Sequence, residues 1–138
     1  MTPGDAESPE DRVRAYRSGA IHYMSNAQEF LVRREFTKTS EFLWGAISQA
    51  IKAVAAGQGI ELRQHRQLWD YARELARELN DAGLFQSFRQ ANALHSNFYE
   101  AGLPAEEVID SIGPIGSAIS KLLDLLPREA SESASEIE

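Results

Sequence analysis

The segment FTKTSEFLWGAISQAIKAVAAGQG, residues 36–59, carries one wide apolar stripe. Its apolar side chains recur at spacings of three and four residues, which is the period of a helix that buries one face. Glycine adopts a left-handed conformation at little cost, so Gly57 and Gly59 are suited to end this helix. We therefore predict a helix that begins near residues 34–37 and ends at Gly57. The stripe comprises Phe36, Phe42, Leu43, Ala46, Ile47, Ala50, Ile51 and Val54.

One helix is predicted before this segment and a third after it. Ser8 can cap the first helix, with Pro9 at its first position and Asp11 three residues after the cap. This helix is expected to run to about Arg33. The third helix is expected at residues 66–79, with leucine and alanine side chains facing inward. Its outward residues are expected to be Arg73, Glu74, Arg77 and Glu78.

Two more helices follow. Residues 84–101 place phenylalanine, alanine and leucine side chains on one face, and we interpret this segment as the core helix. Pro104 is suited to begin a fifth helix at its first turn. Gly113 and Pro114 are expected to kink or briefly interrupt that helix before residues 115–126.

The predicted fold is all-α, because no alternating run of strand length occurs. Consecutive amphipathic helices with short connections pack as antiparallel neighbours. We therefore expect an up-and-down antiparallel bundle of four long helices plus a kinked fifth helix. A single domain is expected at residues 9–126. The flanking segments 1–8 and 127–138 are acidic, have little to bury and are expected to be disordered.

The composition indicates a soluble, cytoplasmic protein. The chain of 138 residues has no cysteine, which excludes disulfides and thiolate chemistry and favours a reducing compartment. The polar, acidic N-terminus does not resemble a signal peptide. No segment approaches the roughly 20 apolar residues of a membrane span, so no membrane partner is expected.

The net charge of −7 is carried by the two ends of the chain. Residues 1–11 and 127–138 are acidic, whereas residues 12–126 are neutral. Three basic clusters lie in this neutral part, and they either form a local basic surface or are solvated helix faces. The clusters are Arg12, Arg14 and Arg17; Arg33, Arg34 and Lys38; and Arg63 and Arg66 beside His65.

The segment RQANALHSNFYE, residues 89–100, concentrates polar side chains in a helix that is otherwise aliphatic. Such a set of phosphate-binding and proton-transferring groups suits the handling of RNA. It equally suits a buried hydrogen-bonded network. The sequence leaves both interpretations open.

Two segments together resemble a known superfamily. Residues 36–68, with SEFLWGA at 40–46 and a later His65, look like the second and third helices of HEPN domains. SEFLWGA paired with ANALHSNFYE, residues 91–100, looks like the PaREP-type archaeal paralogous families within that superfamily. The resemblance covers roughly residues 12–126.

This resemblance implies a catalytic pair. RNA-cleaving HEPN proteins share an Arg, then four to six residues, then a His on the fourth helix, and Arg89 and His95 match that spacing. The implied activity is that of a toxin-like, metal-independent endoribonuclease with a composite cleft between two protomers. Arg89 would hold the scissile phosphate and His95 would exchange protons. Asn92 and Tyr99 would support them.

The pattern departs from the family at one position and demands a dimer. The residue after the Arg is usually Asn, Asp or His, whereas here it is Gln90. Six residues correspond to about 600° of helix, so Arg89 and His95 do not share one face. A single protomer is therefore poorly arranged for catalysis, and we expect a homodimer that binds RNA or a nucleotide.

Structural roles remain open for the same residues. Arg89 can pair with a carboxylate such as Glu41, which would need a partner if buried. His95 can be a neutral core histidine. Trp44 and Trp69 either anchor the core or line a dimer or ligand surface. The whole protein is then a non-catalytic binding module, for example a partner of a nucleotidyltransferase, or a purely structural homo-oligomer.

No cofactor or metal is expected. His22, His65 and His95 are far apart in the chain, without a second ligand three or four residues away that would preorganise a metal. There is no glycine-rich phosphate loop and no nucleophile elbow. Gly45, in the middle of a helix, is expected to permit close helix packing, because glycine there costs about 1 kcal/mol relative to alanine.

Overall fold

Five helices and no strand make up the part of the chain that the structure describes. The structure, a computed structural model, describes residues 8–101 and 104–127, except for the side chains of residues 97–101. An all-α protein is thereby confirmed. The disorder predicted for residues 1–8 and 127–138 lies, except for residues 8 and 127, outside the described residues. The helices are α1 (Pro9–Val32), α2 (Phe36–Gly57), α3 (His65–Glu78), α4 (Ala82–Ala101) and α5 (Ala105–Asp124).

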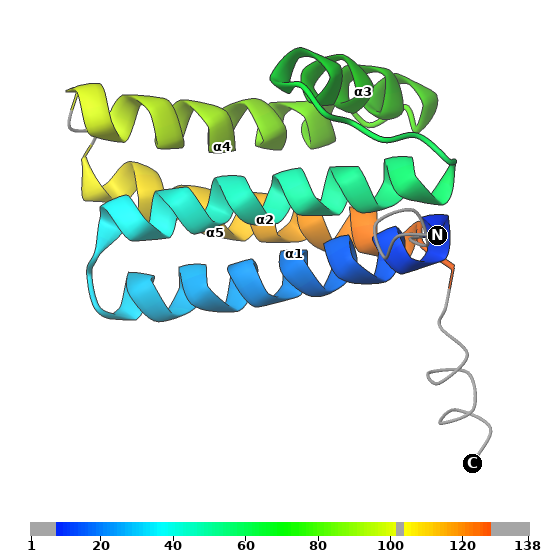
Figure 1. Cartoon of the computed structure of the whole chain (residues 1–138). Helices are drawn as coiled ribbons and strands as arrows, with labels where there is room; N and C mark the ends of the chain where they lie inside the picture. Colours follow the sequence, from blue (N-terminus) through cyan, green and yellow to red (C-terminus); the bar gives the residue numbers. More distant parts are fainter. Residues whose placement is uncertain (1–7, 102–103, 128–138) are drawn as a thin grey trace.

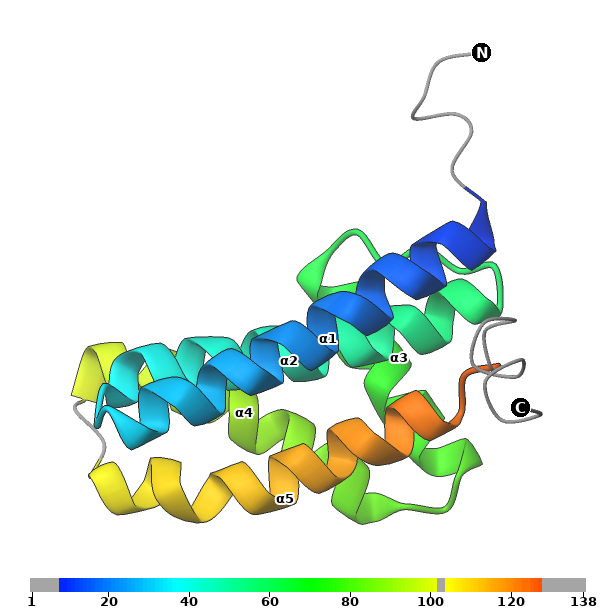
Figure 2. The same cartoon turned by 90° about the horizontal axis from the view of Figure 1, so that it is seen from below.

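Four long helices lie side by side, and the short α3 crosses them at one end (Figures 1 and 2). Along the chain, α1, α2, α4 and α5 run in alternating directions. The predicted bundle of four long helices plus a kinked fifth helix is not confirmed in that detail, because the short helix is α3, with 14 residues, whereas α5 has 20. α3 is short because capping residues bound it closely. Gln64 and Gln67 form a capping box at its start, and Asn80 adopts a left-handed φ of 51° just after its end.

α5 is continuous although Pro114 lies inside it. Proline lacks the N–H that would bond four residues back, and its ring crowds the Cβ of the preceding residue. That residue is Gly113, which has no Cβ. Of the kink or short break predicted at this position, the break is absent, because glycine removes part of the crowding that would otherwise stop the helix.

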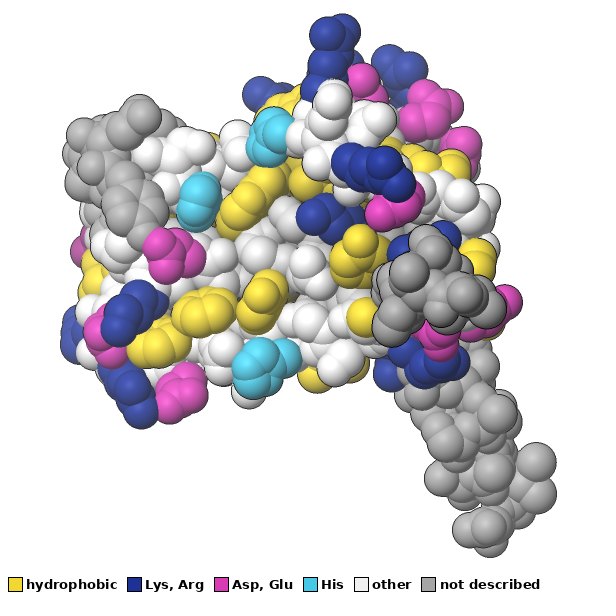
Figure 3. Space-filling view, viewed as in Figure 1, with side chains coloured by type: hydrophobic (Ala, Val, Ile, Leu, Met, Phe, Trp, Pro, Cys, Tyr) yellow, Lys and Arg dark blue, Asp and Glu magenta, His cyan; other side chains and the backbone are white. Residues whose placement is uncertain are grey.

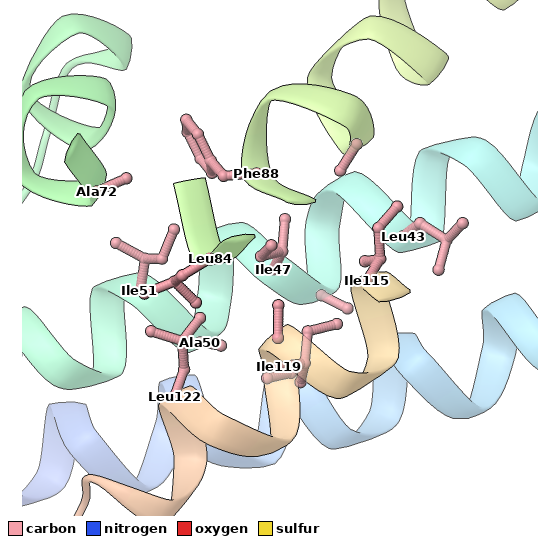
Figure 4. Close-up of a cluster of buried hydrophobic side chains, with 14 of the residues drawn as sticks. Leu43, Ile47, Ala50, Ile51, Ala72, Leu84, Phe88, Ile115, Ile119 and Leu122 are labelled. Carbon is pink, nitrogen blue, oxygen red and sulfur yellow. The ribbon is translucent and has the colours of Figure 1, made fainter. Parts of the chain in front are cut away.

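α2 is the central helix of the molecule. It contacts each of the other four helices, and more than half of its 22 residues are buried. In Figure 4, Ile47 and Ile51 of α2 lie between side chains of α4, such as Phe88, and side chains of α5, such as Ile119. α4, which the sequence analysis favoured as the core helix, instead covers one side of α2. The apolar stripe of residues 36–54 is confirmed as the core-forming one.

α1 packs closely on α2 at Gly45. A Cβ placed on this glycine would lie 2.9 Å from Cδ2 of Tyr23, closer than nonbonded carbon atoms normally approach. The expectation that Gly45 permits close helix packing is confirmed. The predicted start of α1 is also confirmed, because Ser8 and Asp11 form a capping box with Pro9 in the first turn.

Candidate functional site

His95 lies in a cluster of aromatic rings that joins α2, α3 and α4. Its imidazole is partly exposed and stacks on Trp44 of α2, with ring centroids 6.3 Å apart and planes 24° apart. The ring centroid of Trp44 also lies 5.6 Å from that of His65 on α3 and 5.2 Å from that of Phe88 on α4. We call this the aromatic cluster; it comprises Trp44, His65, Trp69, Phe85, Phe88 and His95.

The cluster resolves the two roles proposed for the tryptophans. The ring of Trp69 meets those of Phe88 and Phe85 edge-on, with centroids 5.0 Å and 5.7 Å apart. Trp69 thereby packs against the core. Trp44 also packs against the core, but it lines a surface pocket as well. His95 therefore rests on an aromatic ring that is itself held between three elements, which orients the imidazole. Figure 3 shows histidine side chains on the same face as exposed hydrophobic ones.

Arg89 lies in a different environment, an open pocket of about 480 Å³ between α3 and α4. Its side chain is exposed there beside two further arginines, Arg73 and Arg77. We call this the arginine pocket; it is lined by Arg73, Ala76, Arg77, Asn80, Asp81, Ala82, Phe85, Gln86 and Arg89.

The arginine pocket has an excess of positive charge. Its only lining carboxylate among the described residues, Asp81, accepts a hydrogen bond from Lys121 at 3.3 Å. The guanidinium of Arg73 lies over the ring of Phe85, 5.4 Å from its centroid. Arg77 forms an exposed ion pair with Glu74 at 3.6 Å, and such pairs contribute only about 0–1 kcal/mol. The guanidinium groups are therefore available to an anionic ligand.

Within one protomer, the structure keeps Arg89 and His95 apart. Arg89 lines the arginine pocket, whereas His95 stacks on Trp44, which is not part of that pocket. This agrees with their separation of six residues on one helix, which turns their side chains away from each other. Neither the arginine pocket nor the aromatic cluster holds both side chains within one protomer.

The other predicted site residues are Asn92, Tyr99 and Glu41. Asn92 is half-buried on α4 between Arg89 and His95, whereas the side chain of Tyr99 lies outside the described residues. Glu41 is exposed, and no ion pair between it and Arg89 is found among the described residues. Glu41 is thus not a buried carboxylate that would need Arg89 as a partner, because water solvates its charge.

Gln90, the residue that departs from the family pattern, faces the packing between α4 and α5. Its Nε2 donates a hydrogen bond to Oγ of Ser111 at 3.1 Å. Ser111 is buried, and its hydroxyl donates in turn to the carbonyl of Glu107 at 2.6 Å. The amide of Gln90 thus connects two helices and does not face the arginine pocket.

A second pocket, of about 340 Å³, lies on the other side of the aromatic cluster between α2 and the start of α3. The sequence does not indicate a site here, although the basic group Arg63, His65 and Arg66 lies in this segment. Arg63 pairs with Glu61 at 3.1 Å, and the hydrogen bond from Arg63, followed by its positive charge, lowers the pKa of Glu61. We call this the Trp44 pocket; it is lined by Trp44, Gly45, Ser48, Gln49, Lys52, Leu62, Arg63, Gln64, His65 and Leu68.

No helix of the described residues is long and apolar enough to cross a membrane. Three or more His, Asp or Glu side chains placed to hold a metal ion are likewise not found together in the part of the chain that the structure describes.

The fold and the two pockets define the class: an all-α protein with cationic pockets on either side of a partly exposed aromatic cluster. The chain belongs to the Archaeal PaREP1/PaREP8 family, whose profile matches residues 15–115. The matched range includes the aromatic cluster and both pockets. It confirms the PaREP-type resemblance that SEFLWGA and ANALHSNFYE predict. No curated protein matches the chain.

Proposed function

We propose that this protein is a HEPN-like homodimer that cleaves RNA without a metal ion, in a cleft to which both protomers contribute Arg89 and His95. The observation that carries the proposal is the exposure of Arg89 in a pocket with two further arginines. An arginine retained only for core packing would be paired and buried. The HEPN assignment rests on the resemblance of residues 36–68 and on membership of the PaREP1/PaREP8 family.

The chemistry follows from the side chains. The imidazole of His95 removes the proton from a ribose 2′-hydroxyl, whose oxygen attacks the adjacent phosphorus. The bond from phosphorus to the 5′-oxygen breaks, and that oxygen takes up a proton. The products are a 2′,3′-cyclic phosphate and a 5′-hydroxyl end. DNA is not cleaved, because it lacks the 2′-hydroxyl.

The arginines act on the phosphate. A guanidinium presents a planar fork of donors that matches two phosphate oxygens and stabilises the charge that develops on them. Arg73 and Arg77 bind neighbouring phosphates and position the RNA, while Arg89 binds the scissile one. The arginines give affinity without sequence preference, and the affinity falls as salt concentration rises.

Two-fold symmetry supplies the geometry that one chain lacks. Arg89 and His95 lie on different sides of α4 within a protomer. A two-fold axis close to α4 brings His95 of one protomer toward Arg89 of the other, since a symmetric interface places each patch against its own copy. Dimerisation is thus part of the proposed mechanism.

The test is cleavage of a panel of single-stranded and structured RNAs in excess chelator by the parent protein and by His95→Ala. We expect His95→Ala to lose activity by at least about 100-fold, the usual contribution of a general acid or base. His22→Ala is the matched control, because His22 is exposed on α1 and outside the aromatic cluster. Products of the parent should carry 2′,3′-cyclic phosphates. Equal cleavage by all three proteins would indicate a contaminating nuclease and contradict the proposal.

One observation favours a second candidate, a non-catalytic RNA- or nucleotide-binding module. Gln90 occupies the position where active HEPN proteins carry Asn, Asp or His, and its amide bonds to Ser111 instead of facing a cleft. Such a module would be stabilised by its ligand without forming products. A nucleotidyltransferase-type protein is then the expected partner. Binding of the RNA panel without cleavage would favour this candidate.

A further inference from the structure

The Trp44 pocket has the size and position of a small-molecule site. It measures about 340 Å³, within the range of about 300–1,000 Å³ that is usual for ligand pockets. It lies between α2 and the segment that leads into α3, and it does not include Arg89. It is therefore a site separate from the arginine pocket.

The charge of this pocket suits an anion. Lys52 and Arg63 line it together with His65, and no carboxylate is among its described lining residues. Glu61 pairs with Arg63, but both side chains are exposed, so the pair adds little stability and can open. The guanidinium keeps donors for a ligand, since it has five N–H groups.

A buried hydroxyl in the wall of the pocket lacks a hydrogen-bond partner. Ser48 is 7% exposed, and its Oγ forms no hydrogen bond within the described part of the molecule. Leaving such a group unsatisfied is destabilising. An oxygen of a ligand bound between Lys52 and Arg63 would satisfy it.

The opposite part of the lining is aromatic. Trp44 lines the pocket while the rings of His65, Phe88 and His95 pack against it, so its orientation is set before any ligand binds. Nucleobases of any sequence bind by stacking on such rings. The next residue, Gly45, has no side chain to obstruct the approach.

Hydrogen bonds hold the rim of the pocket in place. Oε1 of Gln67 accepts from the backbone N–H of Arg63 at 2.9 Å and of Gln64 at 3.0 Å. At the other end of the connection, the hydroxyl of Tyr71 donates to Oε1 of Gln58 at 2.5 Å. A rim that is already ordered loses little entropy when a ligand binds.

We propose that the Trp44 pocket binds a nucleotide. Its phosphate contacts Lys52, Arg63 and the hydroxyl of Ser48, and its base stacks on Trp44. The nucleotide is either free or part of an RNA chain, since both present the same phosphate and base. This site does not depend on cleavage at Arg89 and His95, so either proposal can fail without the other.

The test is isothermal titration calorimetry of the full chain with AMP, GMP, CMP and UMP, and with adenosine, inorganic phosphate and a short oligoadenylate. We expect saturable binding of at least one mononucleotide, and binding at least tenfold weaker to adenosine and to phosphate alone. An oligoadenylate that binds where the mononucleotides do not would assign the pocket to a nucleotide within RNA, provided that the variants below weaken it.

Three variants locate the site. Lys52→Gln and Arg63→Gln should each weaken binding at least tenfold. Arg33→Gln is the matched control, because it removes an exposed cation at the end of α1 that lines neither the arginine pocket nor the Trp44 pocket, and it should leave binding within a factor of two. Circular dichroism confirms that each variant is folded. Failure of every probe to bind would overturn the proposal, as would unchanged binding by Lys52→Gln and Arg63→Gln, or loss of binding in Arg33→Gln alone.

A spectroscopic measurement tests the stacking separately. Trp69→Phe leaves Trp44 as the only tryptophan of the chain. A bound mononucleotide should quench its fluorescence in proportion to the calorimetric occupancy, whereas inorganic phosphate should not. Binding without any change in the fluorescence of Trp44 would exclude a base stacked on its ring.

Discussion

Single residues in this chain often serve packing where their type suggests chemistry. Gln90 directly follows the candidate catalytic Arg89, yet its amide connects α4 to α5 through Ser111. Gly45 is a poor helix former in the middle of α2, but its lack of a side chain makes room for Tyr23. The sequence predicted the role of Gly45 because a mid-helix glycine is costly. The sequence did not predict the packing role of Gln90, because its partner Ser111 lies on another helix.

Gly45→Ala should lower the stability of the fold. The added methyl group gains about 1 kcal/mol in helix propensity but forces Tyr23 to move, and overpacking of this kind costs about 1–3 kcal/mol. We expect a net loss of about 1 kcal/mol in the free energy of unfolding, measured by urea denaturation.

Gly83→Ala is the matched control for this prediction. Gly83 lies in the first turn of α4, where an added Cβ would make an ordinary contact of 3.4 Å with Asp81. This variant should be unchanged or more stable by up to about 1 kcal/mol. Equal stabilisation of both variants would show that Tyr23 adapts without cost.

At the scale of helices, local signals set most of the boundaries. Ser8 and Asp11 start α1 through reciprocal hydrogen bonds of 3.1 and 3.2 Å, and Gly59 adopts a left-handed φ of 76° just after α2. α5 is the exception. The sequence rule for proline predicted a kink or a short break, and the break is absent, because Gly113 before Pro114 lacks the Cβ that the ring would crowd.

The start of α1 should make stability depend on pH. The N–H of Ser8, then its hydroxyl and the charge of Arg14, lower the pKa of Asp11. A carboxyl group whose pKa is lower in the folded state stabilises the fold above its ordinary pKa of about 4. That contribution is lost as the pH falls below this value. Urea denaturation between pH 7 and 3 should therefore show that the free energy of unfolding falls less for Asp11→Asn than for the parent.

Ser8→Ala provides the comparison at neutral pH. It removes the hydroxyl that caps α1 and should lower the free energy of unfolding by about 0.5–2 kcal/mol at pH 7. The assignment to Asp11 fails if the parent and Asp11→Asn lose stability in parallel as the pH falls.

For the molecule as a whole, the central position of α2 explains how the sites arise. α2 contacts all the other helices, so that Trp44 can meet His65 from α3 and His95 from α4 at once. α3 crosses the long helices and brings Arg73 and Arg77 beside Arg89. Both pockets therefore depend on where this one short helix lies.

A complementation experiment tests the composite cleft at this scale. Arg89→Ala and His95→Ala should each be inactive alone. Heterodimers of the two, formed by unfolding and refolding them together, contain one intact Arg89 and one intact His95 on opposite protomers. We expect such mixtures to regain RNA cleavage, and sedimentation to show dimers. Dimers that stay inactive when mixed would exclude catalysis by residues that act across the interface.

The sequence by itself determined the helical class, most helix ends and the family of this protein. These follow from capping residues and from a hydrophobic period that interact within a few positions along the chain. It also identified Arg89 and His95 as candidates, and their separation around α4 follows from helical geometry alone.

Only the tertiary structure decided which residues share a pocket. Lys52 and Ser48 of α2 line one pocket with Arg63, which precedes α3, and Arg73 and Arg77 of α3 line the other with Arg89 of α4, through contacts between separate segments of the chain. Such contacts depend on the directions in which the helices cross, and the periodicity of a single helix does not specify them.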